Sequence, residues 1–177
     1  MREKYTHCRY YPLERISFFA LGLAASVVLP FATHLLGPGG DIPLGARLLP
    51  MFYAPYLLAV RIGYLEAVAV GSFAPYLNML LTSRPDPSNV LSLSIEIAVF
   101  AVFSRYLSRW SGGSIYSGAM AAILSFFIVT IVLGERLLCV LSPGRTGAFL
   151  ETLMIALPGL IMLVLLDCLL KAGRDES

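Results

Sequence analysis

Long apolar runs separated by short polar segments dominate this chain. The runs cover 16–36, 46–60, 62–82, 90–107, 115–133 and 148–170. Most are close to the roughly 20 residues that a straight helix needs to cross a bilayer. The pattern predicts an all-α membrane protein, a bundle of about six transmembrane helices. The predicted organisation is a leader over 1–15, one transmembrane domain over 16–171 and a short tail over 172–177.

The second run is the exception in length. It has 15 residues and contains Pro50 and Pro55. Such a segment is short for a full crossing, and we expect it to be broken, tilted or enclosed by neighbouring helices that satisfy its freed backbone groups. Six spans are predicted, and five spans plus a re-entrant segment are the alternative. The first run is expected to kink near Pro30.

The third run carries small or compact residues at intervals of four: Gly63, Ala67, Gly71 and Pro75. At 3.6 residues per turn this ladder stays on one side of a helix. Small side chains let another backbone approach closely, which is a main source of helix association in membranes. The ladder therefore predicts the packing centre of the bundle.

Composition and charge agree with a membrane protein. The chain is 58% hydrophobic and 14% charged, whereas a soluble domain carries roughly a quarter charged residues. With the leader in the cytoplasm, nine of the thirteen lysines and arginines fall on the inner side and four on the outer side. The positive-inside rule then predicts that both termini are cytoplasmic. The four outer cations are Arg47, Arg84, Arg136 and Arg145.

Polar residues inside the spans gather toward the predicted outer side. Asn78 lies about one turn and Glu96 roughly two turns below that surface, and Glu151 lies near it. A carboxylate is costly in lipid and should face a cavity or a partner. Glu96 and Glu151 are therefore either solute ligands or halves of ion pairs with Arg47 or Arg136. The pattern predicts a cup that opens outward without a polar path to the cytoplasm.

Two acidic residues fall near the predicted inner ends of spans. Glu66 is expected to form an interfacial ion pair with Arg61. Asp167 lies in the last span, and its expected partner is a nearby cation such as Arg105 or Lys171. Neither residue is predicted to contribute to the cup.

Several function classes lack their sequence signals. The chain has no phosphate-binding G-x-x-x-x-G-K-[ST], no H-E-x-x-H and no G-x-S-x-G motif, so no enzyme is predicted. Its two histidines and three widely separated cysteines predict no metal site, cofactor or disulfide framework. Its basic residues are not interleaved with a stacking surface, which argues against nucleic-acid binding.

Three motifs lie in the central part of the chain. They are LPMFYAPYLLAV over 49–60, APYLNMLLTSRP over 74–85 and SIEI over 94–97. Residues 42–107, which contain them, resemble the substrate-binding membrane subunits (S components) of energy-coupling factor (ECF) transporters. The family's usual Gly-Pro before the third span is replaced by Arg61-Ile62, and its Gly after Thr82 is replaced by Ser83.

The resemblance implies a multi-pass protein of the prokaryotic plasma membrane. Such a subunit captures a small water-soluble vitamin or vitamin-like solute from outside, then docks on a transmembrane coupling subunit that works with two cytoplasmic ATPase subunits. Ala20 and Ala24 of the first span match the docking pair of the family. The candidate substrate-binding residues are Arg47, Tyr53, Asn78, Glu96 and Glu151. The alternative function is a non-transporting assembly or anchoring protein of the membrane, in which the Gly63–Gly71 ladder binds a partner helix.

Overall fold

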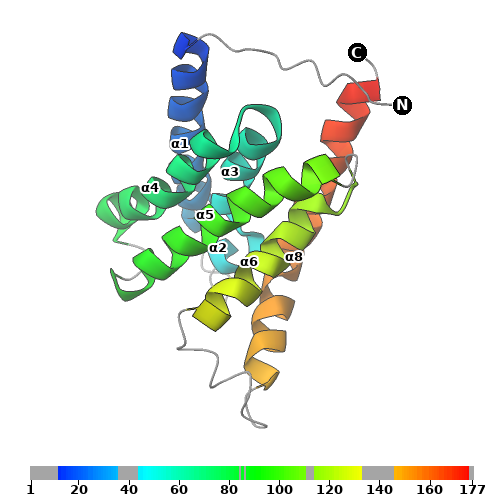
Figure 1. The fold of residues 1–177 in the computed structure, drawn as a ribbon. Helices are drawn as coiled ribbons and strands as arrows, with labels where there is room; N and C mark the ends of the chain where they lie inside the picture. Colours follow the sequence, from blue (N-terminus) through cyan, green and yellow to red (C-terminus); the bar gives the residue numbers. More distant parts are fainter. Residues whose placement is uncertain are drawn as a thin grey trace.

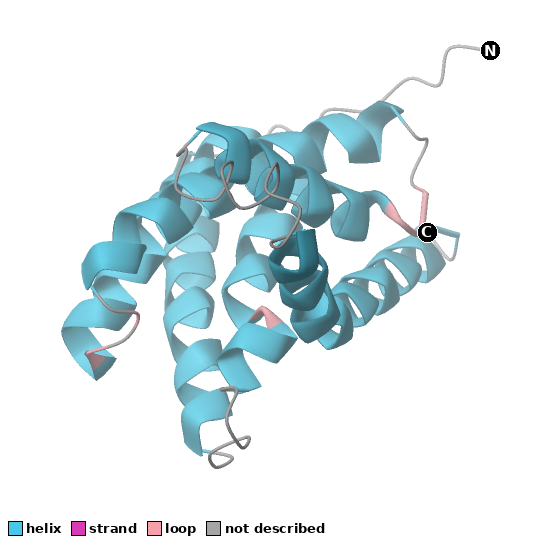
Figure 2. Ribbon diagram, turned by 90° about the horizontal axis from the view of Figure 1, so that it is seen from below, coloured by secondary structure: helices cyan, strands magenta, loops and turns pink. Residues whose placement is uncertain are grey.

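The computed structural model describes residues 12–35, 44–83, 85, 87–110, 114–132 and 146–175. Every regular element in these residues is an α-helix, as Figures 1 and 2 show, so the predicted all-α fold is confirmed for this part of the chain. The helices are α1 (Pro12–Leu35), α2 (Leu44–Leu48), α3 (Pro50–Arg61), α4 (Tyr64–Thr82), α5 (Pro87–Trp110), α6 (Ser117–Val132) and α8 (Thr146–Asp175).

Four of the described helices are long and apolar enough to cross a membrane. Their apolar windows are Leu13–Thr33, Tyr64–Thr82, Asn89–Trp110 and Leu153–Gly173. The apolar part of α6, Ser117–Val129, is shorter. The start of α1 and the end of α8 lie at the same end of the bundle, at the top of Figure 1. Which side of the membrane this end faces stays a prediction of the charge pattern.

The second apolar run forms two short helices instead of one span. Leu49 separates α2 from α3 and adopts left-handed backbone angles, φ 51° and ψ 45°. Pro50 follows as the first residue of α3, a position where its missing N–H costs nothing. The 12 residues of α3 extend about 18 Å, well short of a bilayer core. The expectation of a broken and enclosed segment is therefore confirmed.

Helix α3 lies at the centre of the bundle. Phe52 is 1% exposed and Tyr56 is fully buried, as is Ala59 in the last turns. The ring of Phe52 meets Phe100 of α5 edge to face, with centroids 4.8 Å apart. The main core cluster adds small or branched side chains from α6 and α8: Ala119, Ala121, Ala122, Leu160 and Leu163.

The small-residue ladder of α4 packs inside the molecule. Ala67, Gly71 and Pro75 are all buried. A Cβ atom on Gly71 would lie 2.7 Å from Cγ2 of Ile97 and 3.2 Å from its backbone carbon, so the α4 and α5 backbones approach closely at this point. This confirms the packing role predicted for Ala67, Gly71 and Pro75, whereas Gly63 lies outside the helix, as the extended residue before α4. At Gly71 the ladder is filled by α5 and is not open to an external partner helix.

Helix α1 has an inner and an outer face. Gly22, Ser26 and Pro30 are buried, and a Cβ atom on Gly22 would come within 2.5 Å of Leu58 of α3. Ala20 and Ala24 are exposed on the opposite side. The helix is continuous through Pro30.

The contact between α4 and α5 can be tested by adding bulk at Gly71. Gly71→Leu should lower the free energy of unfolding by about 1–3 kcal/mol, because the new side chain collides with the α5 backbone. Phe73→Leu is the control, since Phe73 is exposed on the same helix and should change stability by about 0.5 kcal/mol or less. Unfolding of the purified variants in detergent measures both. Equal stability of the two variants would contradict this packing.

Candidate functional site

The predicted solute ligands occupy different surroundings in the structure. Arg47 lies in the last turn of α2, Tyr53 lies in the first turn of α3, and Glu96 lies on α5. All three are half-buried. Asn78 of α4 is 1% exposed. Glu151 belongs to α8, but its side chain lies outside the described part of the chain.

Asn78 joins α4 to α1. Proline has no N–H, so Pro30 leaves the carbonyl of Ser26 without its usual donor in α1. The Nδ2 atom of Asn78 donates to this carbonyl at 3.0 Å, and it also donates to the carbonyl of Ala74 at 3.1 Å. Asn78 thus repairs the hydrogen bond that Pro30 removes, and its amide nitrogen contributes to helix packing.

One side of the Asn78 amide remains chemically open. Its Oδ1 atom is buried and has no hydrogen-bond partner among the described residues, and the same holds for the hydroxyl of Ser26. Asn78 is almost fully covered in this structure, so Oδ1 is not accessible to a solute here. Asn78 is thus more deeply buried than the other candidate solute ligands, Arg47, Tyr53 and Glu96.

Tyr53 supports the break between α2 and α3. Its hydroxyl donates to the carbonyl of Leu48, which precedes the left-handed residue. Helix α8 packs closely at the same point, since a Cβ atom on Gly159 would lie 2.8 Å from both the carbon and the oxygen of the Leu48 carbonyl. The break is therefore enclosed by α8, and Arg47 lies two residues before it.

Glu96 lies on the face of α5 that is turned toward the core. It precedes Phe100 by one helical turn, and Phe100 packs on Phe52 of α3. Leu93 and Phe103, on the same face, are partly buried against the same core cluster. Glu96 is thus placed toward α3, whereas the Asn78 amide is directed at α1.

The ion pair predicted for Glu66 forms with a different cation. Glu66 pairs with Arg15 of α1, and Arg61 is exposed to the surroundings. The predicted Glu66–Arg61 pair is therefore wrong. The reason is that the first turns of α1 lie close enough to the start of α4 to place Arg15 beside Glu66, whose side chain is 14% exposed.

Asp167 also differs from its expectation, because its partners are neutral donors. The side chain is 7% exposed and accepts hydrogen bonds from the hydroxyl of Tyr56, the hydroxyl of Ser117 at 3.0 Å and the N–H of Gly118 at 2.8 Å. The hydroxyls of Tyr56 and Ser117 are also 2.9 Å apart. The expected cation partner, Arg105 or Lys171, is not among these contacts.

The Asp167 contacts connect three helices at one point. The carboxylate belongs to α8, Tyr56 to α3, and Ser117 and Gly118 begin α6. An anion at a helix N-terminus satisfies free N–H groups and interacts favourably with the helix dipole. In the sequence, the junction shows only as a tyrosine in a proline-containing helix and an aspartate late in the last span. Nothing in the sequence indicates that these two residues are partners.

Arg105 closes the other end of α3. Its Nη1 atom donates to the carbonyls of Ala59 and Val60, both at 2.9 Å. These carbonyls lie in the last turn of α3, where no later helical N–H can reach them. Arg105 therefore acts as a C-terminal cap supplied by α5.

The contacts of Asn78, Tyr53, Asp167 and Arg105 all hold helices together. Within the described ranges, no group of three or more His, Cys, Asp or Glu side chains could hold a metal ion. The buried Asp167 is occupied by three donors that hold helices together. Arg47, near the α2–α3 break, and Glu96, on the inner face of α5, are both half-buried.

Comparisons of the chain with protein-family models, with curated proteins and with solved structures found no match in any of the three. The resemblance to S components therefore depends on the three central motifs of the sequence alone.

The Asp167 junction makes a direct prediction. Tyr56→Phe removes one donor from a buried carboxylate and should lower the free energy of unfolding by about 1–3 kcal/mol. Tyr76→Phe is the matched control, because Tyr76 is 40% exposed on α4 and should be near neutral. Chemical unfolding in detergent gives both values. A Tyr56→Phe effect as small as that of the control would contradict the junction.

Proposed function

We propose that this chain is the substrate-binding membrane subunit of an ECF-type importer. It captures a small water-soluble vitamin or vitamin-like solute from outside the cell. It then delivers the solute after docking on a transmembrane coupling subunit, which works with two cytoplasmic ATPase subunits. The proposal starts from the resemblance of residues 42–107 to S components and is supported by the features below.

The interrupted α2–α3 segment is the observation that carries the proposal. Irregular backbone at membrane depth is tolerated where it is buried in protein or lines a cavity. Transporters commonly build their solute sites at such interruptions. Here the interruption at Leu49 is enclosed by α8 through Gly159, and it is preceded by the half-buried Arg47.

The proposed solute ligands are Arg47 and Tyr53, which lie near the break, and Glu96 on the inner face of α5. An arginine and a carboxylate provide donors and acceptors for a polar solute, and an intramembrane ionisable residue is by default a functional candidate. Glu151 remains a proposed ligand on the basis of the sequence pattern alone. We assign Asn78 mainly to the contact between α1 and α4, since its amide nitrogen is used there.

The outer face of α1 supports the proposed docking surface. Ala20 and Ala24 are exposed, one turn apart, on the side away from Leu58 and Asn78. Small residues on an exposed face allow a partner helix to approach closely. This face is therefore suited to the coupling subunit.

Two substitutions on opposite faces of α1 test the docking surface. Ala24→Leu should leave a folded protein that binds solute but no longer assembles with the coupling subunit. Gly22→Leu should instead lower the free energy of unfolding by about 1–3 kcal/mol, because its side chain would collide with Leu58. Thermal unfolding and co-purification with the coupling subunit measure the two effects. Unfolding of Ala24→Leu, or normal assembly of that variant, would contradict the assignment.

The solute site is tested by Glu96→Gln, after mass spectrometry has identified the molecule that copurifies with the protein. Loss of one charge-assisted hydrogen bond should weaken solute affinity by about 1.5–3 kcal/mol, roughly ten- to a hundredfold. The stability of the empty protein should change little.

A structural ion pair between Glu96 and Arg47 would give a different result. Stability of the empty Glu96→Gln protein would then fall by about 3–5 kcal/mol, and an added Arg47→Met would restore much of it. That pattern in the melting curves would remove Glu96 from the proposed site.

A further inference from the structure

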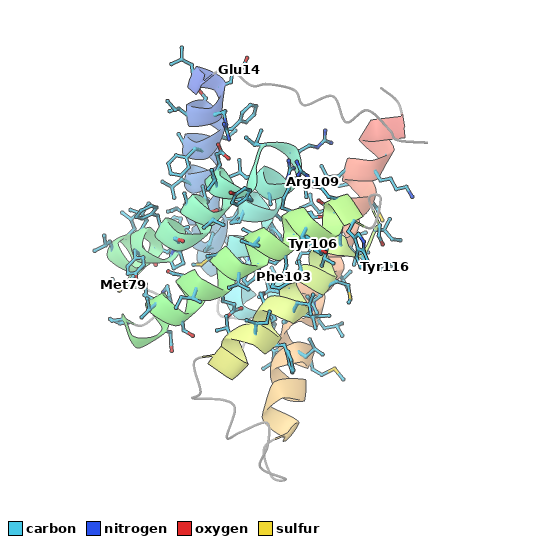
Figure 3. All side chains as sticks on the ribbon, viewed as in Figure 1. Glu14, Met79, Phe103, Tyr106, Arg109 and Tyr116 are labelled. Carbon is cyan, nitrogen blue, oxygen red and sulfur yellow. The ribbon has the colours of Figure 1, made fainter. Side chains whose placement is uncertain are left out.

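A groove near the C-terminal end of α5 does not contribute to the proposed solute site. It has a volume of about 580 Å³ and is lined by Tyr64 of α4 and by five residues of α5: Val102, Arg105, Tyr106, Arg109 and Trp110. Figure 3 labels Tyr106 and Arg109 on the C-terminal half of α5. The lining holds two arginines and no carboxylate.

The groove lies at the level where lipid headgroups meet the hydrocarbon core. The apolar window of α5 ends at Trp110, and that of α4 begins at Tyr64. Tyrosine and tryptophan collect at this level because one part of each ring system is apolar and another is polar. Tyr106 and Trp110 stack with centroids 6.3 Å apart, and Tyr64, Tyr106 and Trp110 are all more than half exposed.

The two arginines retain hydrogen-bonding capacity. Arg105 uses Nη1 for the end of α3, and its Nη2 and Nε make no hydrogen bond to the described residues. Arg109 is exposed and has no ion pair within the described part of the chain. Glu66, the acidic residue of α4, pairs with Arg15 and does not line the groove.

We infer that this groove binds the headgroup phosphate of an anionic phospholipid. The guanidinium of Arg109, with the free N–H groups of Arg105, meets the phosphate, and an acyl chain runs down past Val102. Guanidinium groups match phosphate geometry well, and a cation close to an anionic membrane surface contributes about 1 kcal/mol. The apolar wall and the position at the membrane surface favour a lipid over a free anion.

The only tryptophan of the chain, Trp110, provides the probe for this site. The full-length protein is placed in bilayers of equal parts phosphatidylglycerol and phosphatidylcholine, with brominated acyl chains on one lipid at a time. Bromine quenches tryptophan on contact, so the ratio of the two quenching signals gives the lipid preference at the groove. The wild-type protein should prefer phosphatidylglycerol, and equal quenching by both lipids would overturn the inference.

Matched variants separate the groove from general surface charge. Arg109→Gln should reduce the preference roughly fivefold, the equivalent of about 1 kcal/mol. Arg109→Lys keeps the charge and should retain most of the preference. Arg61→Gln removes an exposed arginine at the same end but outside the groove, and it should have little effect. An equal loss in Arg61→Gln and Arg109→Gln would overturn the assignment to this groove.

Inorganic phosphate distinguishes a lipid from a free anion. Exchanging chloride for phosphate at constant ionic strength should leave the quenching by brominated phosphatidylglycerol unchanged. Loss of that quenching on adding phosphate would show a site for soluble anions and overturn the assignment to a lipid.

Discussion

The need to satisfy backbone groups inside an apolar interior controls this structure. Lipid offers no hydrogen bonds, so every freed carbonyl or N–H requires a partner from the protein. Pro30 frees the carbonyl of Ser26, and the break at Leu49 frees the carbonyl of Leu48. The end of α3 frees the carbonyls of Ala59 and Val60. Side chains donate hydrogen bonds to these carbonyls: Asn78 to Ser26, Tyr53 to Leu48, and Arg105 to Ala59 and Val60.

Asp167 solves the converse problem, because it accepts from the free N–H of Gly118 at the start of α6 and from the hydroxyl of Tyr56. Helix α3 is thus held at its beginning by Tyr53, in its middle by Tyr56 and at its end by Arg105. These three contacts hold the short helix in position, so it can carry a binding site at its start. This rigidity is what the proposed solute site beside Arg47 requires.

Features that depend on one helix were predictable from the sequence, and features that depend on how helices rotate against one another were not. The apolar runs and the two prolines predicted helices and an interrupted second segment. The spacing of Ala67 and Gly71 predicted a close helix contact. Arg61 is close to Glu66 in sequence and was the predicted partner, but the orientation of α1 makes Arg15 the residue that forms the ion pair. Asn78 was expected to face a solute, yet the direction of its amide depends on a carbonyl freed in α1.

Hydrogen–deuterium exchange of the full-length protein in lipid nanodiscs tests the central claim, that neighbouring side chains satisfy the interrupted segment. The account predicts slow exchange of the amides over 51–58 despite the break and the two prolines. It also predicts that Tyr53→Phe speeds exchange around Leu49 while amides in the middle of α5 keep their rates, since only the donor to Leu48 is lost. Fast exchange over 51–58 in the wild-type protein, or unchanged exchange around Leu49 in the variant, would contradict the account.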